Sequence, residues 1–313
     1  MISPSPAPVR SAPSFVEFRE EIQSLYANDC GQKAFSRLRK VLRQVAGLGV
    51  TELAEITPLV LSRWRQTVSH LAPLSQKSDY GSLVTALDFA VRAGYLERSP
   101  AKVWPLRFST KKTVMKRHLS LAEIKALFDQ LKSEIPTGKI AHKLYALTAM
   151  IYLTGMRLGE AQRLTVSQID LDTGFIDLTD MELKTPLSSS LVAMPDALIE
   201  VLRGWLPFCE SPWAFPHAGK GRPGPWISGT TANRPLGRLQ AAAARAGLTE
   251  VTFKAGRHTW STMARMHVGY SDAIVQAQLR HTTPRTAREN YTHYDASIQR
   301  ETVRAFRYPG LTG

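Results

Sequence analysis

Two arginines and a tyrosine stand in short motifs along the second half of the chain. Arg157 lies in TGMRLGE, Arg257 follows about a hundred residues later in KAGRHT, and Tyr291 lies in NYTHYD. A tyrosine hydroxyl can attack a phosphodiester if fixed cations neutralise the charge that builds on the phosphate oxygens. Arginine suits this task because its charge is permanent and its planar guanidinium can donate two parallel hydrogen bonds. The set predicts phosphodiester cleavage through a covalent tyrosine intermediate.

The remaining polar groups that such a reaction needs are also present. The leaving 5′ oxygen requires a proton donor, and lysine or histidine can fill that role. The candidates are Lys184 in LKTP, Lys254 three residues before Arg257, and His281 in LRH, which precedes Tyr291 by ten residues. This set can act without a metal ion, and we expect no cofactor.

In order and spacing these motifs resemble the active site of the tyrosine recombinases, the phage-integrase family. The resemblance covers nearly the whole chain from Ser14 onward. It implies that Arg157 and Arg257 clamp the scissile phosphate and that Glu160 braces the site from behind.

The resemblance also assigns roles to the other candidates. Lys184, on a β-hairpin after the first arginine, matches the lysine that protonates the leaving oxygen. Lys254 takes a position where the family usually has histidine and sometimes lysine. His281 would donate a hydrogen bond to the phosphate, and Tyr291 would form the 3′-phosphotyrosine.

Two departures from the family pattern affect the end of the motif set. Arg280 replaces the glycine that usually precedes the histidine. The interval from His281 to Tyr291 is one residue longer than is usual, which makes Tyr294 a rival nucleophile. We favour Tyr291 because its local motif matches the family better.

Composition agrees with a nucleic-acid partner. Among 313 residues, Lys and Arg number 40 and Asp and Glu 26, which gives a net charge of +14. Such an excess in a folded chain indicates a polyanionic partner, and duplex DNA is the first candidate. Two distant cysteines predict neither a disulfide framework nor a zinc site. No signal peptide or membrane-length apolar run is evident, so we expect a cytoplasmic protein, nucleoid-associated when bound to DNA.

The first half of the chain predicts short helices. After a flexible tail over residues 1–13, Ser14 can cap a helix, and a second helix is expected over about 32–46. The residues expected to face the core are Phe15, Phe18, Ile22 and Leu25 in the first helix and Phe35, Leu38, Leu42 and Val45 in the second. The residues expected to reach DNA phosphates are Lys33, Arg37 and Lys40. Thr57-Pro58 and Ser75 predict two further helix starts.

The resemblance identifies residues 14–104 as an all-α, SAM-like core-binding domain. A basic interdomain linker follows over 105–118 and should lie along the DNA backbone. Its candidate phosphate contacts are Lys111, Lys112, Lys116 and Arg117.

Residues 119–313 are expected to form the catalytic domain. Ser120 and Glu123 predict a capping box, and a long apolar helix should run from 139 to about 152. Residues 175–178 and 191–194 predict strands, and the chain from Pro235 onward reads as helical. The fold class is therefore mainly α with a small antiparallel sheet. A C-terminal helix over 296–308, with Ile298, Thr302, Ala305 and Phe306 on one face, could dock on its own domain or on a neighbouring protomer.

The resemblance implies a site-specific recombinase that closes as a C-shaped clamp on duplex DNA and acts as a tetramer on synapsed sites. Integration or excision of a mobile element or cassette is the expected role. Two alternatives remain open at this point. One is DNA relaxation of the type IB topoisomerase kind, and the other is a DNA-binding regulator that has lost catalysis.

Overall fold

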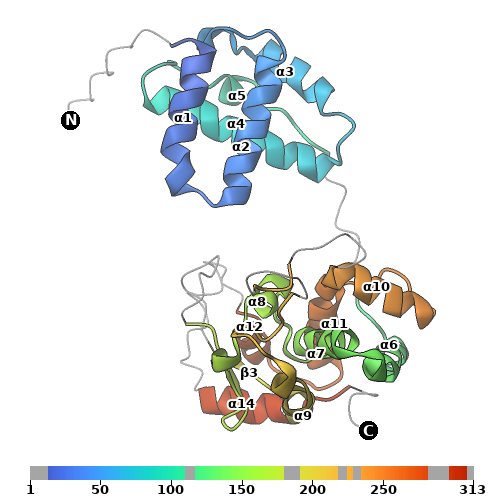
Figure 1. Ribbon diagram of the computed structural model, residues 1–313. Helices are drawn as coiled ribbons and strands as arrows, with labels where there is room; N and C mark the ends of the chain where they lie inside the picture. The colour runs from blue at the N-terminus through green and yellow to red at the C-terminus, as the bar shows by residue number, and fades with distance from the viewer. Residues whose placement is uncertain are drawn as a thin grey trace. The chain divides into compact units, whose positions relative to one another are not determined.

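A computed structural model describes residues 13–109, 117–179, 191–217, 224–227, 234–280 and 296–308. The chain divides into two compact units, Met1–Val114 and Met115–Gly313 (Figure 1). The division falls inside the basic stretch 105–118. The described ranges are mainly helical and include one three-stranded antiparallel sheet, which confirms the predicted fold class.

The first unit is helical throughout its described range. Its elements are α1 (Phe15–Asp29), α2 (Gln32–Ala46), the 3₁₀ turn η1 (Leu53–Glu55), α3 (Pro58–Thr67), α4 (Pro73–Arg92) and α5 (Pro100–Val103). Ser14 caps α1 in a capping box with Glu17, and the Thr57 hydroxyl caps α3 by accepting from the amide of Val60. Helix α4 begins at Pro73 rather than at Ser75, because the proline ring suits the first turn of a helix.

The core of this unit follows a slightly different stripe from the one the sequence predicted. Phe15, Phe18 and Ile22 are fully buried, but Leu25 is 49% exposed. The stripe continues instead through Tyr26, four residues after Ile22, whose ring meets Phe89 edge-on at 6.3 Å.

Helix α2 shows a similar difference. Its buried face consists of Leu38, Val41, Leu42 and Val45, and the predicted Phe35 is only partly covered in the first turn. Helix α2 packs along α4, and the two together line one side of the unit's core.

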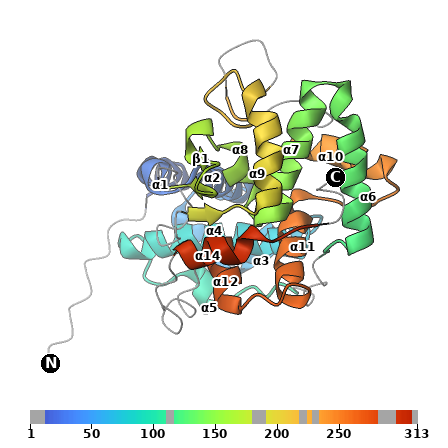
Figure 2. The ribbon, with the colours of Figure 1, turned by 90° about the horizontal axis from the view of Figure 1, so that it is seen from below.

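The second unit is built around one buried helix, α7. Its helices and 3₁₀ turns are α6 (Leu121–Glu134), η2 (Ile135–Thr137), α7 (Lys139–Thr154), α8 (Leu158–Gln162), η3 (Val166–Gln168), α9 (Asp196–Trp205), η4 (Leu206–Phe208), α10 (Pro235–Arg245), α11 (Phe253–Met266), α12 (Asp272–Leu279) and α14 (Ala296–Arg304). Every residue of α7 from Lys143 onward is buried, as expected of a helix that is apolar all round. Helices α6, α9 and α11 pack against it, and Figure 2 shows α7 running between α9 and α6.

The sheet follows α8 and consists of β1 (Ile169–Asp170), β2 (Phe175–Asp177) and β3 (Leu191–Ala193), in that order. Both pairs are antiparallel, with Ile176 opposite Ile169 on one side and Val192 on the other. Strands β2 and β3 lie where they were predicted. The two-residue β1 was missed because it is too short to show an alternating pattern. Lys184, in the connection from β2 to β3, lies outside the described residues.

The C-terminal helix α14 docks on its own unit. Val303 is fully buried with Ala193 and Ile274, and Arg300 and Arg304 reach the carboxylate of Asp196 at 2.9 and 3.0 Å. The predicted contact face was wrong in part: Phe306 is buried, but Ile298 is 53% exposed. In the ranges that the structure describes, no helix combines the length and apolarity that crossing a bilayer requires.

Candidate active site

Three motif segments that are far apart in sequence meet at Gly155. This residue ends α7 in the left-handed conformation, with φ of 69°. A Cβ there would lie 2.5 Å from Cδ2 of Leu279 and 3.0 Å from Cε3 of Trp260. Because only glycine accommodates both that backbone angle and those contacts, Gly155 lets the TGMRLGE segment, the KAGRHT segment and the end of α12 at Leu279 come into direct contact.

Arg157 leaves this junction as the N-cap of α8 and is fixed by Glu160. Its backbone N–H donates to Oε2 of Glu160 at 2.9 Å, and its Nη1 donates to Oε1 at 2.8 Å. The Arg157 side chain is 48% exposed, whereas that of Glu160 is 11% exposed. The arginine can therefore meet a ligand from solvent while its carboxylate partner stays behind it.

Arg257 crosses from α11 to the same junction. Its Nη1 donates to the carbonyl of Gly155 at 2.5 Å, and its Nη2 donates to the carbonyl of Leu279 at 2.6 Å. The guanidinium thus joins the end of α7 to the end of α12. Burial, reinforced by the charges of Arg157 and Arg280, lowers the pKa of Arg257. A cation held beside other cations in a partly dry site favours binding of an anion.

The residue before Arg257 allows α11 to approach α7 closely. A Cβ on Gly256 would lie 2.4 Å from Cε2 of Tyr152, whose ring is buried in the core. The Tyr152 hydroxyl donates to the carbonyl of Thr252, which precedes α11, at 3.3 Å. The small residue therefore sets the helix crossing that carries Arg257 to Gly155.

Arg280 adds a third guanidinium to this group. Its side chain is fully buried, and its Nη2 donates to Oε2 of Glu160. Burial alone would raise the pKa of Glu160, but the charge of Arg280 and the hydrogen bonds from Arg157 outweigh it, and the net pKa is lowered. Three arginines around one ionised carboxylate leave an excess of positive charge, which suits a phosphodiester.

Of the other predicted catalytic residues, the structure describes Lys254 alone. Lys254 lies on α11 one turn before Arg257 and is exposed. His281 and both tyrosines, Tyr291 and Tyr294, lie outside the described residues, as does Lys184. Their roles stay predictions. In the sequence, His281 directly follows Arg280.

Gln278 is a connecting residue that the sequence analysis did not identify. Its buried amide donates to the carbonyls of Ala193 at 2.8 Å and Thr154 at 3.3 Å, and its Oε1 accepts from the amide of Ala193 and from Gln299. It thereby links the ends of α7, β3 and α14. A sequence signal existed, because Gln278 interrupts the apolar face of α12 four residues after Ile274.

The first unit carries the predicted phosphate-contacting residues on α2. Lys33, Arg37 and Lys40 are exposed and share one side of the helix. Asp79 of α4 is 4% exposed. Its Oδ2 accepts a hydrogen bond from Lys40 Nζ at 2.7 Å, and its Oδ1 lies 3.6 Å from Arg37 Nε. The carboxylate of Asp79 thus holds these two cations on a common face of the unit.

Arg117, predicted to contact DNA from the linker, has two protein partners in the described part of the chain. Its Nη2 lies 2.6 Å from Oε1 of Glu123 and donates to the carbonyl of Thr249. Glu123 is also the capping-box partner of Ser120. Arg117 thus fastens the start of α6. The other three predicted linker contacts, Lys111, Lys112 and Lys116, lie outside the described residues.

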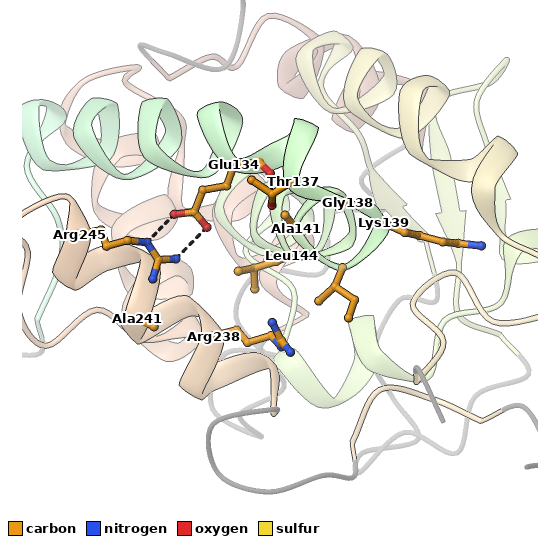
Figure 3. Close-up of a pocket in the computed structure, with 10 residues that line it drawn as sticks. Glu134, Thr137, Gly138, Lys139, Ala141, Leu144, Arg238, Ala241 and Arg245 are labelled. Atoms are coloured by element: carbon orange, nitrogen blue, oxygen red, sulfur yellow. Dashed lines mark hydrogen bonds and ion pairs between the residues drawn. The ribbon is translucent and has the colours of Figure 1, made fainter. Parts of the chain in front are cut away.

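A separate cavity of about 620 Å³ lies between the start of α7 and α10 (Figure 3). Glu134 and Arg245 form a two-pronged ion pair across one wall, with both bonds at 2.8 Å. Arg238 and Lys139 add two further cations, and none of the described residues that line the cavity is a candidate catalytic residue. Within the described ranges, no cluster of three or more His, Cys, Asp or Glu side chains could hold a metal ion.

Comparison with known proteins places this geometry in context. Residues 117–297 match the phage integrase family. The tyrosine recombinase XerC of Erythrobacter litoralis (strain HTCC2594) is 27% identical over 251 residues, which cover 79% of this chain and 77% of the relative.

Two solved structures share the fold. A lambda integrase tetramer bound to a Holliday junction is similar with a TM-score of 0.66 and 18% identity, covering 91% of this chain and 80% of that one. The Tn1549 transposon integrase in complex with transposon right end DNA has a TM-score of 0.67 and 15% identity, covering 92% and 98%.

Proposed function

The chain belongs to the phage integrase family, the tyrosine recombinases of site-specific DNA recombination, and we propose that it cuts and rejoins duplex DNA through a 3′-phosphotyrosine formed by Tyr291. The observation that carries the proposal is the junction at Gly155. There Arg257 donates hydrogen bonds to the carbonyls of Gly155 and Leu279, and Arg157 lies two residues after Gly155 in the chain. Residues about a hundred positions apart thereby supply the paired guanidinium groups that phosphodiester chemistry requires.

The reaction follows from the charges of these groups. Arg157 and Arg257 bind the non-bridging oxygens of the scissile phosphate and stabilise the charge that grows on them in the transition state. Tyr291 loses its hydroxyl proton to solvent, and its oxygen forms a bond to phosphorus as the bond to the 5′ oxygen breaks. Lys184 gives that 5′ oxygen its proton, and His281 and Lys254 donate further hydrogen bonds to the phosphate. Attack by a 5′ hydroxyl on the phosphotyrosine then reverses these steps and rejoins the strand.

The substrate that suits the first unit is also DNA. Lys33, Arg37 and Lys40 form a basic face on α2, and contacts of that kind bind phosphates with little sequence preference. We expect residues 14–104 and 119–313 to act as separate DNA-binding and catalytic domains on one duplex. The lambda integrase tetramer on a Holliday junction supports four protomers acting together, and the Tn1549 complex supports exchange of a mobile element.

A plasmid carrying two copies of DNA from the flanks of the native gene tests the proposal. The wild-type protein should exchange strands between the copies and yield deletion or inversion products, whereas Tyr291→Phe should yield none. Relaxation of supercoils without exchange would contradict the proposal in favour of a topoisomerase activity. Binding without cleavage on a randomised DNA library would contradict it in favour of a regulator.

A further inference from the structure

Arg280 occupies a position that is costly for an arginine. It ends α12 with φ of 51° and ψ of 50°, in the left-handed region that residues other than glycine rarely adopt. The residue is 3% exposed. In the described part of the chain its Nε and Nη1 have no hydrogen-bond partner. A buried guanidinium with unpaired nitrogens on a strained backbone is unlike an ordinary surface arginine.

The bond that Arg280 does form connects the two halves of the candidate site. Oε2 of Glu160 accepts from Arg280 Nη2 and from the backbone N–H of Arg157, while Oε1 accepts from Arg157 Nη1. Arg257, in turn, bonds the carbonyl of Leu279, the residue next to Arg280.

These bonds close a ring through the site. The ring runs from Arg157 to Glu160, then to Arg280 and its neighbour Leu279, then to Arg257 and back to Gly155 near Arg157. Arg157 is half-exposed and could otherwise adopt several rotamers, so a fixed Glu160 restricts where its guanidinium can point. Arg280 is the link that fixes Glu160 from α12.

We propose that Arg280 is a positioning residue, which acts through Glu160 to hold Arg157 in register with Arg257 on the scissile phosphate. The inference rests on the proposed function. Arg280 also begins the segment that leads directly into His281, so the same buried bond fixes the point from which that segment starts.

The test compares Arg280→Gly with Arg265→Ala in the intact protein. Glycine suits the left-handed backbone and removes the guanidinium. Arg265 is the matched control, because its Nε pairs with Oδ1 of Asp272 at 2.7 Å at the opposite end of α12, outside the ring. The readouts are the rate constant of covalent adduct formation on saturating nicked duplex and the Kd for that duplex.

Arg280→Gly should lower the rate constant by at least about tenfold and change Kd by less than about twofold, as expected when transition-state alignment alone is lost. Arg265→Ala should change neither. Because Arg280 acts through Glu160, the double variant with Glu160→Gln should cleave no more slowly than the slower single variant. Wild-type cleavage by Arg280→Gly, or multiplicative losses in the double variant, would overturn the proposal.

Two provisions keep the test decisive. If Arg280→Gly melts below the assay temperature, Arg280→Lys replaces it; this variant keeps the charge but not the guanidinium fork and should show the same loss. If the wild type forms no adduct on any duplex, the proposed function fails. The melting temperatures of the same single and double variants then show whether Arg280 and Glu160 are coupled through the ring of bonds. Non-additive shifts would support it, and additive shifts would overturn it.

Discussion

Arg157→Met and Arg257→Met should slow cleavage to a similar extent but lower stability to different extents. Methionine keeps most of the apolar stem and removes the guanidinium. Arg257 donates to the carbonyls of Gly155 and Leu279 from a partly buried position, whereas Arg157 pairs with Glu160 from a side chain that is 48% exposed.

The magnitudes follow from these contacts. Hydrogen bonds to charged groups contribute about 1.5–3 kcal/mol each, and Arg257→Met removes two of them. Because the variant also removes the desolvation cost of a buried guanidinium, the free energy of unfolding should fall by about 3 kcal/mol. For a unit of this size the melting temperature should fall by about 6–12 °C. The exposed pair of Arg157 stabilises by at most about 1 kcal/mol, which corresponds to less than about 4 °C.

Cleavage should respond to both variants in the same way. In the proposed mechanism each arginine contacts the phosphate in the transition state, so each variant should cleave about 10²–10³-fold more slowly. Differential scanning calorimetry gives the melting temperatures of the catalytic unit, and single-turnover cleavage of a nicked duplex gives the rates. Normal cleavage by either variant, or equal destabilisation by both, would refute the reasoning.

Three further predictions concern other parts of the second unit. Gly256→Ala should lower the free energy of unfolding by about 1–3 kcal/mol and slow cleavage, because its Cβ would overlap the Tyr152 ring. The control Gly204→Ala, whose Cβ would make only a 3.9 Å contact, should change neither stability nor cleavage. Unchanged stability of Gly256→Ala would argue against the close crossing of α11 and α7. Burial lowers the pKa of Lys143 to about 8. Between pH 8 and the unfolded pKa of about 10.4 the unfolded chain therefore binds more protons than the folded chain, so the stability of the wild type should rise with pH relative to that of Lys143→Met, by up to about 3 kcal/mol. Parallel pH profiles of urea unfolding for the two proteins would contradict this. Lys184→Ala should cleave slowly on ordinary DNA but recover on a substrate with a 5′-bridging phosphorothiolate, whose sulfur leaves without a proton, and unchanged slow cleavage would argue against a proton-donor role.

The parts of the fold that short-range chemistry specifies could be predicted from the sequence. Ser120 and Glu123 form the expected capping box, α7 begins at Lys139 and ends within two residues of the predicted position, and β2 and β3 pair as expected. These features depend on a few adjacent residues and on apolar periodicity, which a single sequence displays directly.

The parts that depend on tertiary contacts were not predictable in the same way. The face of α14 was assigned partly wrongly, because Val303 docks between Ala193 and Ile274, which lie far away in sequence. The roles of Gln278 and Arg280 emerge only from partners on other elements. The sequence did show Arg280 as a departure from the family, and the left-handed backbone at that position gives the departure a physical meaning.

The central claim is that Tyr291 attacks DNA within the arginine group at Gly155. The most direct measurement is a denaturing-gel search for a covalent adduct on nicked duplex DNA from the flanks of the native gene, followed by mass spectrometry of the linked peptide. The account predicts an adduct on Tyr291 that is lost in Tyr291→Phe and retained in Tyr294→Phe. An adduct on Tyr294, or none on a randomised library that the protein binds tightly, would contradict it.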